Sequence, residues 1–346
     1  MIISASRRTD IPAFYGEWLV NRLRAGEVLV RNPMQSKQVS RILLTPDAVD
    51  AIVFWTKNPE NFLSRLPEID ALGYSYYFLF TLTPYNATLE PGVPEKGKIL
   101  EVFRQLSRLI GPEKVVWRYD PVVLTDRFTP EWHTAAFSRI AGELSGYTER
   151  GIISFLDDYR KIRSRMRDIR YVLPDTAAMG EIAARFADIA CKQGIALFTC
   201  CHDIDLSRHG IMHSRCIDAE LIERISGRRL LRVKKDSSQR HACGCVESRD
   251  IGSYNTCGHG CLYCYAMSSH AKVLAACKSC DPLSPLLCDA LRGDEVVTTV
   301  AVRKHIPSAA SLPSAGFRQE DLFLSLDILP VVGVAGDERA QGAHGD

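Results

Sequence analysis

The chain has 346 residues, of which 46% are hydrophobic and 24% are charged, and its formal net charge is +2. This composition is typical of a globular protein with room for one large α/β barrel or two ordinary domains. It excludes a protein that wraps nucleic acid through charge alone, and no apolar run is long enough to span a bilayer. The sequence also lacks the pattern of a signal peptide, so it predicts a cytoplasmic protein without membrane association.

Six short apolar runs alternate with amphipathic stretches over the first two hundred residues. The runs are 2–5, 51–55, 76–82, 114–117, 151–155 and 194–199, and the amphipathic stretches lie near 15–23, 97–109, 131–144 and 179–192. Strands that alternate with helices predict parallel βαβ units with right-handed crossovers. Six such units could close as a (β/α)6 barrel, and a doubly wound open sheet is the structural alternative.

Each predicted strand is followed by polar or ionisable residues. Because the carboxyl ends of parallel strands meet at one edge, these residues predict one functional face. Some of them, such as Asp10, are better explained as N-caps of the following helices. Capping does not explain Arg7, Arg8, Lys57 or Arg118, which we expect to face a ligand. The segments concerned are 6–10, 56–59, 83–85, 118–121, 157–159 and 200–203.

The twelve cysteines are concentrated in the second half of the chain. None occurs before Cys191, and eleven lie between Cys200 and Cys288. In a reducing compartment such cysteines favour metal binding over a disulfide framework.

Three cysteines, Cys257, Cys261 and Cys264, form a Cys-x-x-x-Cys-x-x-Cys motif with Tyr263 before the last one. Three thiolates can hold three corners of a 4Fe-4S cluster and leave the fourth iron open to a small molecule. This spacing is typical of radical S-adenosylmethionine (SAM) enzymes. The alternative is a zinc site completed by His259 or Cys245, although the spacing is unusual for zinc.

A second site is predicted from Cys200, Cys216, Cys243 and Cys245. Cys243 and Cys245 cannot be further ligands of the first cluster, because a fourth thiolate would occupy its open iron. Together the four thiolates would suit an auxiliary 4Fe-4S cluster or a structural zinc. The alternative is that Cys200 and Cys216 are small buried hydrophobic residues. The remaining cysteines Cys277, Cys280 and Cys288 have no evident partners.

A basic segment, 227–250, surrounds two of these cysteines. It is either a solvated surface or a region that contacts the phosphates of an anionic substrate. Its cationic residues are Arg228, Arg229, Arg232, Lys234, Lys235, Arg240 and Arg249.

Four segments, 6–12, 54–59, 117–121 and 243–266, closely resemble the DUF1848 family. This is a set of radical-SAM proteins that carry the cluster motif near the C-terminus, and the resemblance extends to about Leu287.

A looser resemblance is to spore photoproduct lyase and the related DNA repair photolyase radical-SAM proteins. It is carried by 257–265, 56–59 and 89–92. That likeness implies that Lys57 meets the SAM carboxylate, that Tyr263 lies beside the adenine and that Tyr265 relays a hydrogen atom. Those relatives open with the cysteine motif, whereas this chain nearly ends with it. The resemblance therefore implies a permuted radical-SAM (β/α)6 partial barrel, with the cysteine loop brought back over the strand ends.

The function implied is reductive cleavage of SAM to a 5′-deoxyadenosyl radical, which abstracts hydrogen from a substrate. We expect Lys57, Glu90 and Arg118 to hold the charged groups of SAM, because guanidinium and ammonium groups pair with carboxylates. Arg7, Arg8 and Asp120 are the candidates that face the substrate. The lyase resemblance makes nucleic acid a candidate substrate, and flavodoxin or ferredoxin the candidate electron donor. The alternative is a non-catalytic nucleic-acid-binding protein stabilised by zinc or an iron–sulfur cluster.

Three regions are predicted: a barrel core over 1–205, a cysteine-rich segment over 206–291 that packs on the carboxyl face of the barrel, and a largely flexible tail over 292–346. Within the tail, Gln319–Phe323 resembles the short peptide that docks bacterial proteins on the replication sliding clamp. Such a peptide would bury Leu322 and Phe323 in an apolar groove. The alternative is that 322–329 is a packed terminal segment.

Overall fold

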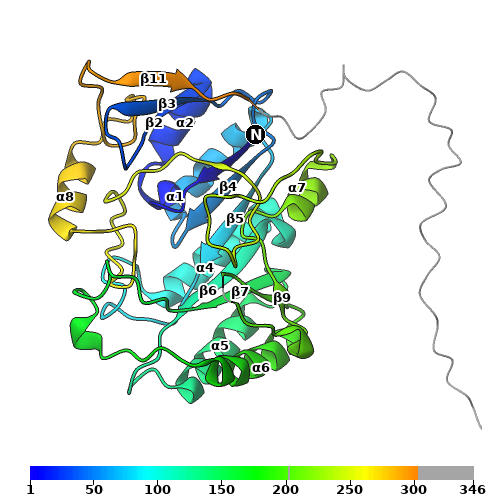
Figure 1. The fold of residues 1–346 in the computed structure, drawn as a ribbon. Coiled ribbons are helices and arrows are strands. Elements are labelled where there is room, and N and C mark those ends of the chain that lie inside the picture. Colours follow the sequence, from blue (N-terminus) through cyan, green and yellow to red (C-terminus); the bar gives the residue numbers. More distant parts are fainter. Residues whose placement is uncertain (202, 303–346) are drawn as a thin grey trace, which may run out of the picture. The chain divides into compact units, whose positions relative to one another are not determined.

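A computed structural model describes residues 1–201 and 203–302 of the chain (Figure 1). The chain divides into two units, and all the described residues belong to the first, Met1–Ile306. The predicted clamp-binding segment 319–323 and most of the predicted tail, 303–346, lie outside the described residues. The domain limits at 205 and 291 stay predictions.

The first unit is built on an eight-stranded sheet in which every neighbouring pair is parallel. Six neighbouring strands confirm the six predicted ones, and they lie in chain order. The protein is therefore of mixed α/β class. Across the sheet the strands are β10 (Arg249–Asp250), β1 (Ile2–Ala5), β4 (Ala51–Thr56), β5 (Tyr76–Thr81), β6 (Val115–Val122), β7 (Arg150–Phe155), β8 (Ala196–Thr199) and β9 (Met212–His213).

The predicted helices are also confirmed, as α2 (Gly16–Ala25), α4 (Lys96–Ile110), α5 (Pro130–Leu144) and α6 (Thr176–Lys192). Local signals set their starts: Thr129 Oγ1 caps α5 by accepting from Trp132 N at 3.2 Å. The shorter helices are α1 (Ile11–Phe14), α3 (Leu66–Ala71), α7 (Ala219–Ser226) and α8 (His270–Lys278), with 3₁₀ turns η1 (Glu60–Arg65), η2 (Pro112–Lys114), η3 (Arg167–Ile169) and η4 (Ser207–His209).

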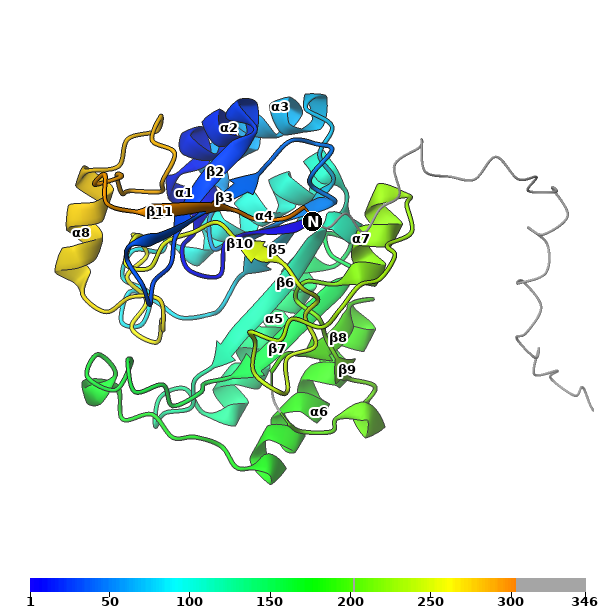
Figure 2. The ribbon, with the colours of Figure 1, turned by 45° about the horizontal axis from the view of Figure 1, so that its top comes forward.

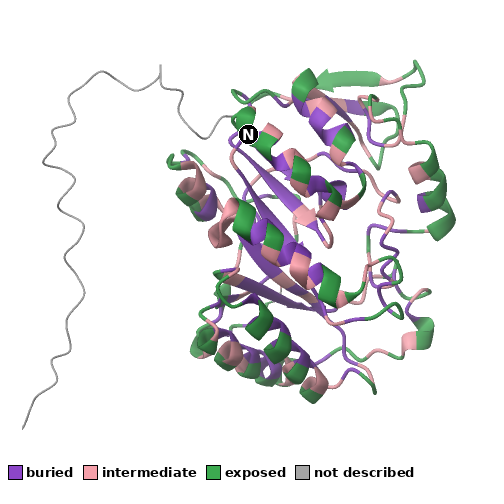
Figure 3. Ribbon diagram, turned by 180° about the vertical axis from the view of Figure 1, so that it is seen from behind, coloured by how far each residue is buried: buried purple, intermediate pink, exposed green. Residues whose placement is uncertain are grey.

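The two faces of the sheet are covered differently. Residues such as Phe78, Trp117 and Ile153 pack against the buried sides of the long helices. Their strand neighbours, such as Leu79 and Val116, pack instead against α7 and the cysteine-rich segment. Figure 3 shows the strands buried and the helices exposed on their outer sides. Because both faces are covered, the strands are near-continuous apolar runs, which explains why they could be predicted.

A second, three-stranded sheet was not predicted. It consists of β2 (Glu27–Arg31), β3 (Gln38–Leu43) and β11 (Val296–Thr299), and β2 and β3 pair antiparallel (Figure 2). β11 pairs in parallel with β3 and belongs to the segment predicted as the tail. Its four residues are exposed, so no buried face produces an alternating pattern by which it could be recognised.

β10 brings the cysteine-rich segment back to the main sheet. Arg249 and Asp250 pair in parallel with β1, and the Asp250 carboxylate accepts from Ser4 Oγ at 3.0 Å, from Ser6 Oγ at 2.7 Å and from Arg7 N at 2.8 Å. Because β10 is parallel to β1, the chain after Asp250 leaves the sheet at the carboxyl ends of the strands. The cysteine motif begins seven residues later.

Candidate functional site

The cysteine loop, residues 257–264, lies against segments that follow other strands. Leu262 N donates to Leu89 O at 3.0 Å, and Gly92 N donates to His259 O at 2.9 Å. A Cβ atom at position 92 would lie 2.6 Å from the Gly258 carbonyl oxygen, so only glycine permits this approach. The 89–92 segment and the cysteine motif, which the sequence presents far apart, are therefore packed together as expected from the resemblance.

Asp10 and His259 fasten the loop to the end of β1. Asp10 Oδ1 accepts from Ala13 N at 3.0 Å, which confirms its predicted role as a helix cap. Its second oxygen lies 2.8 Å from His259 Nε2 and accepts from Lys57 N at 2.6 Å. The other ring nitrogen of His259 lies 3.3 Å from Gly92 O. Both nitrogens of His259 are thus engaged in holding the loop.

Arg165, which the sequence analysis did not identify, binds the other end of the loop. Its guanidinium donates to Leu262 O at 3.2 Å, to Met267 O at 2.6 Å and to Cys264 O. Arg165 lies in the connection between β7 and α6, where no pattern in the sequence distinguishes it from a solvated arginine. Five donors on one planar group allow it to satisfy several loop carbonyls at once.

Cys261 of the loop is buried, with 5% of its surface exposed, and Cys257 and Cys264 are half-buried. Burial raises the pKa of Cys261 to about 12, although Lys57 acts in the opposite direction. Burial also raises the pKa of Cys257 and of Cys264. Metal binding would displace the thiol protons, because thiolates are the ligating form.

Glu90 lies at the centre of a charged network beside Cys261, and it is 1% exposed. Its Oε1 accepts from Lys57 Nζ at 2.8 Å, from Thr83 Oγ1 at 2.5 Å and from the Tyr263 hydroxyl. Its Oε2 accepts from Lys96 Nζ at 2.5 Å.

These interactions determine the charge state of the network. Burial acts to raise the pKa of Glu90, but Lys57 and Lys96 outweigh it and lower the pKa to about 2. Two ammonium groups therefore face one carboxylate, which leaves one positive charge next to Cys261. The structure brings the predicted residues Lys57, Glu90 and Tyr263 together and adds Lys96.

Five cysteines, not four, gather at the second predicted site. Cys200 Sγ lies 3.2 Å from Cys216 Sγ and 3.5 Å from Cys201 Sγ. Cys201 and Cys245 each hydrogen-bond to Cys243, and Cys245 also hydrogen-bonds to Cys216. Each sulfur therefore contacts two others, and we call the set Cys200, Cys201, Cys216, Cys243 and Cys245 the five-sulfur ring.

Cys201 is missing from the predicted set because adjacent residues in an extended chain point to opposite sides. Its φ of +62° places it in the left-handed region, which turns its side chain toward Cys200. Sequence spacing alone gives no signal for such a turn.

The ring thiols differ in acidity: hydrogen bonds from neighbouring thiols lower the pKa of Cys201 and Cys245, whereas the pKa of Cys200, Cys216 and Cys243 is raised. Hydrogen bonds from Cys216 and Cys243, together with the charge of Arg7, hold the pKa of Cys245 below its ordinary value. Burial acts to lower the pKa of Arg118, but Asp120, Cys216 and Cys200 outweigh it and raise that pKa.

Arg7 and Arg118 also flank Trp55. Their guanidinium carbons lie 5.3 Å and 4.9 Å from the centre of its ring. Arg118 pairs with Asp120 and donates to Thr81 Oγ1 at 3.3 Å. Three buried donors here have no hydrogen-bond partner in the structure: Arg7 Nη2, Trp55 Nε1 and Arg118 Nε. Buried donors without partners are rare in folded proteins, and three of them occur together here.

The remaining predicted residues lie nearby. Arg8 stacks over Tyr254, with its guanidinium carbon 5.2 Å from the ring centre, and donates to Gly252 O at 3.4 Å. Tyr265 donates to Arg7 O at 3.0 Å and remains 37% exposed. Arg8 therefore faces the connection after β10, whereas Tyr265 lies at an open edge beside Arg7.

The basic segment is only partly neutralised. Arg240 pairs with Asp157, and Arg249 with Glu247 at 3.3 Å. All seven cationic residues of the segment are exposed.

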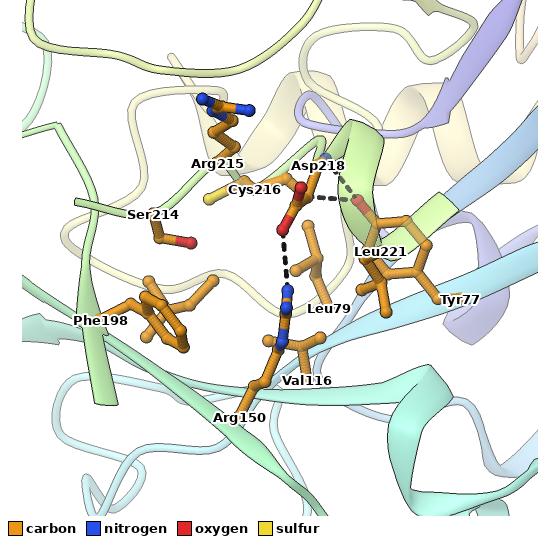
Figure 4. A pocket seen from close by; sticks show the side chains of 11 residues that line it. Tyr77, Leu79, Val116, Arg150, Phe198, Ser214, Arg215, Cys216, Asp218 and Leu221 are labelled. Atoms are coloured by element: carbon orange, nitrogen blue, oxygen red, sulfur yellow. Dashed lines mark hydrogen bonds and ion pairs between the residues drawn. The ribbon is translucent and has the colours of Figure 1, made fainter. Parts of the chain in front are cut away.

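A small pocket lies on the cysteine-covered face of the sheet, between β5 to β8 and α7 (Figure 4). Arg150 and Asp218 pair across it at 2.7 Å, and the Tyr77 hydroxyl donates to Cys216 O at 2.6 Å. Of the predicted site residues it includes only Cys216. Arg150 and Asp218 already pair with each other, and Arg215 pairs with Glu220 at 3.5 Å, so the pocket offers little for a ligand.

As they stand, no three His, Cys, Asp or Glu side chains within 1–201 and 203–302 are arranged to hold a metal ion. Among the helices of that same part of the chain, none has the length and apolar character needed to cross a membrane.

Comparison with known families gives one match. A family model described as "Domain of unknown function (DUF1848)" matches residues 2–266. The match includes the whole eight-stranded sheet, the cysteine loop and the five-sulfur ring, and it ends before α8. No curated protein matches the chain.

Proposed function

The chain belongs to the DUF1848 family, and we propose that it is a radical-SAM enzyme with a 4Fe-4S cluster on Cys257, Cys261 and Cys264. The observation that carries the proposal is the cysteine loop. It lies over the ends of β1, β4 and β5 and beside the Lys57–Glu90 network. With its thiol spacing, this arrangement resembles the radical-SAM site more closely than any zinc site.

The fold supports a permuted partial barrel. In the relatives named above the cysteine motif comes early in the chain, and here it follows β10 instead. Because β10 pairs in parallel with β1 at the edge of the sheet, the loop still emerges among the carboxyl ends. We therefore take the eight parallel strands as an open form of the (β/α)6 barrel.

The residues around the loop suit a cluster with one open iron. His259 is engaged by Asp10 and Gly92, and Cys245 belongs to the five-sulfur ring. Neither candidate for a fourth ligand is therefore free to close the site. The positive charge of Lys57 and Lys96 would stabilise the anionic thiolate cluster. When bound, the cluster and SAM would supply a 5′-deoxyadenosyl radical.

Lys57 is our candidate for the SAM carboxylate. Lys96 can neutralise Glu90 alone, so Lys57 can be shared with a second carboxylate at little cost. Tyr263 would fix the position of Glu90 through its hydroxyl. Arg118 is farther along the sheet, next to Asp120 and the five-sulfur ring, and its contacts favour the substrate side over SAM.

The donors around Trp55 support an acceptor-rich substrate. Arg7 Nη2, Trp55 Nε1 and Arg118 Nε would be satisfied by the oxygens of a carboxylate or phosphate. Tyr265 lies beside Arg7 and is exposed, as a residue that passes a hydrogen atom to substrate must be. Nucleic acid, whose phosphates offer such oxygens, stays a candidate, with flavodoxin or ferredoxin as the electron donor.

The five-sulfur ring would hold a second metal centre, an auxiliary 4Fe-4S cluster or zinc. Four thiolates complete either site, and the ring offers one more than is needed. The second candidate function, a metal-stabilised nucleic-acid-binding protein without catalysis, is favoured only by the exposed basic segment.

The test is anaerobic. Reconstituted protein is reduced with dithionite and given SAM, and 5′-deoxyadenosine is quantified against the Cys261→Ala variant and a Cys191→Ala control. We expect product from the wild type and from the control, and none from Cys261→Ala. Zinc in place of iron at the loop, or equal product from all three proteins, would contradict the proposal.

A further inference from the structure

Three cysteines lie beyond the part of the chain that the family model matches. Cys277 is in the last turn of α8, Cys280 follows the helix, and Cys288 ends the next loop. The sequence gives a Cys-x-x-Cys pair with no second pair to complete it.

The structure brings Cys277 and Cys288 to one hydroxyl and places Cys280 against Cys288. Tyr15 Oη lies 3.2 Å from Cys277 Sγ and hydrogen-bonds to Cys288. The Cys280 and Cys288 thiols hydrogen-bond to each other. All three thiols are partly buried, and all pack on the edge of the main core. We call Cys277, Cys280 and Cys288 the third thiol group.

The loop between Cys280 and Cys288 is fastened to α2 and β2. Trp18 Nε1 donates to Ser284 O at 2.9 Å, Asn21 Nδ2 to Pro282 O at 3.1 Å, and Leu29 N to Pro285 O at 2.9 Å. These bonds hold the loop by its backbone, so the positions of the flanking thiols are set by the fold.

The third thiol group is adjacent to the cysteine loop. Cys277 Sγ donates to Thr256 O at 3.5 Å, and the Tyr15 hydroxyl donates to the same carbonyl. The next residue along the chain is Cys257.

We propose that Cys277, Cys280 and Cys288 bind an additional iron–sulfur cluster, with Tyr15 beside its fourth position. Three thiolates suffice for three corners of a cluster, as in the cysteine loop. As they stand, no three side chains in the described residues are arranged to hold a single ion. A structural zinc takes four protein ligands, whereas three thiolates can hold a cluster. Small buried hydrophobic residues would not need to converge on a polar hydroxyl.

This centre would lie one residue from a ligand of the first cluster, which suits electron transfer between them. Its existence does not depend on SAM cleavage, so failure of either proposal leaves the other testable.

Iron and acid-labile sulfide are counted in anaerobically reconstituted full-length protein. The variant is Cys277→Ser/Cys280→Ser/Cys288→Ser, and the matched control is Cys191→Ser, a cysteine outside all three groups. We expect the triple variant to lose about four iron and four sulfide per chain and the control to lose none. Unchanged iron, or loss of zinc instead of iron, would overturn the proposal.

Alkylation of the wild type tests the same site without mutation, in case the triple variant does not fold. Iodoacetamide is applied anaerobically before and after removal of iron by a chelator, and peptides are identified by mass spectrometry. We expect Cys277, Cys280 and Cys288 to be labelled only after chelation and the exposed Cys191 to be labelled in both cases. Equal labelling before and after chelation, or a Cys280–Cys288 disulfide in the native protein, would contradict the cluster.

Discussion

The cysteine loop and the five-sulfur ring are built from the same residue type but in opposite ways. In the loop, consecutive backbone carries all three thiols, and the surrounding charges pair with one another through Glu90. In the ring, five thiols from three separate segments touch one another, and Arg7 and Arg118 beside them keep donors without partners.

The difference indicates separate tasks. Under the proposal above, three thiolates beside a paired charge network would hold a cluster with one open iron. The touching thiols of the ring would instead surround a metal centre of their own, and the unpartnered donors beside them would bind an acceptor from the substrate. We therefore propose that SAM binds at the loop and that the substrate binds near Arg7, Trp55 and Arg118.

The largest effect is expected on 5′-deoxyadenosine formation, which should differ between a variant of the cysteine loop and a variant of the five-sulfur ring. Cys261→Ser is expected to remove 5′-deoxyadenosine formation, because it removes a ligand of the SAM-binding cluster. Cys245→Ser is expected to retain it in the absence of substrate, because the loop is intact. Both are measured by chromatography of anaerobic reactions. Loss of 5′-deoxyadenosine from both variants, with each still folded by circular dichroism, would show that the groups are not independent.

Glu90→Gln should destabilise the protein. It leaves two partly buried ammonium groups without a counter-charge, at a cost of roughly 2 kcal/mol in the free energy of unfolding. Urea titration measures it, with Glu131→Gln on the surface as the control.

The same carboxylate predicts a pH dependence. Its folded pKa of about 2 lies below its ordinary value of 4.5, so the unfolded chain binds the proton more tightly. The stability it contributes is complete above the unfolded value and is lost as the pH falls from 4.5 to about 2. Glu90→Gln should flatten the stability curve in that window, and a curve with the wild-type slope would argue against the network.

Gly92→Ala tests the contact between the 89–92 segment and the loop. The added Cβ would lie 2.6 Å from the Gly258 carbonyl oxygen, so we expect a loss of about 2 kcal/mol. Gly142→Ala in α5 is the matched control, since its Cβ meets nothing within 4 Å, and helix propensity predicts a gain of roughly 0.5–1 kcal/mol. Equal effects in thermal unfolding would mean that the loop does not lie against Gly92.

The smallest effect is expected from Trp55→Phe. It keeps an aromatic ring between the two guanidinium groups and removes the unpartnered N–H together with part of the ring system. Since no hydrogen bond is lost, stability should change by less than about 1 kcal/mol. If the substrate binds here, the variant should raise KM for substrate and leave 5′-deoxyadenosine formation without substrate unchanged. A lower yield in the absence of substrate would place Trp55 on the SAM side instead.

The sequence predicted the elements whose signals are local. Strands buried on both faces are apolar runs, and the long helices carry a clear apolar stripe, so β4, β5 and α4 could be recognised directly. The spacing of Cys257, Cys261 and Cys264 is also a local signal, so the cysteine loop could be recognised from the sequence. The exposed β11 and the two-residue β9 and β10 have no such signal.

Contacts that depend on folding could not be predicted. The position of Cys201 in the ring depends on its own left-handed backbone conformation. The role of Arg165 depends on the β7–α6 connection passing close to the carbonyl groups of Leu262, Cys264 and Met267. Lys96, the first residue of α4, pairs with Glu90, but nothing in the sequence distinguishes it from a lysine on the surface. The partners of Tyr15 in the third thiol group lie more than 250 residues away.

Electron paramagnetic resonance of the Cys245→Ser variant, reduced anaerobically and recorded with and without SAM, tests the assignment of the loop most directly. In that variant the loop still has all its ligands, and the ring has lost one. We expect the signal of a reduced 4Fe-4S cluster whose g values shift when SAM is added, because SAM binds the open iron. A spectrum that SAM leaves unchanged, from protein carrying a full cluster at the loop, would contradict it.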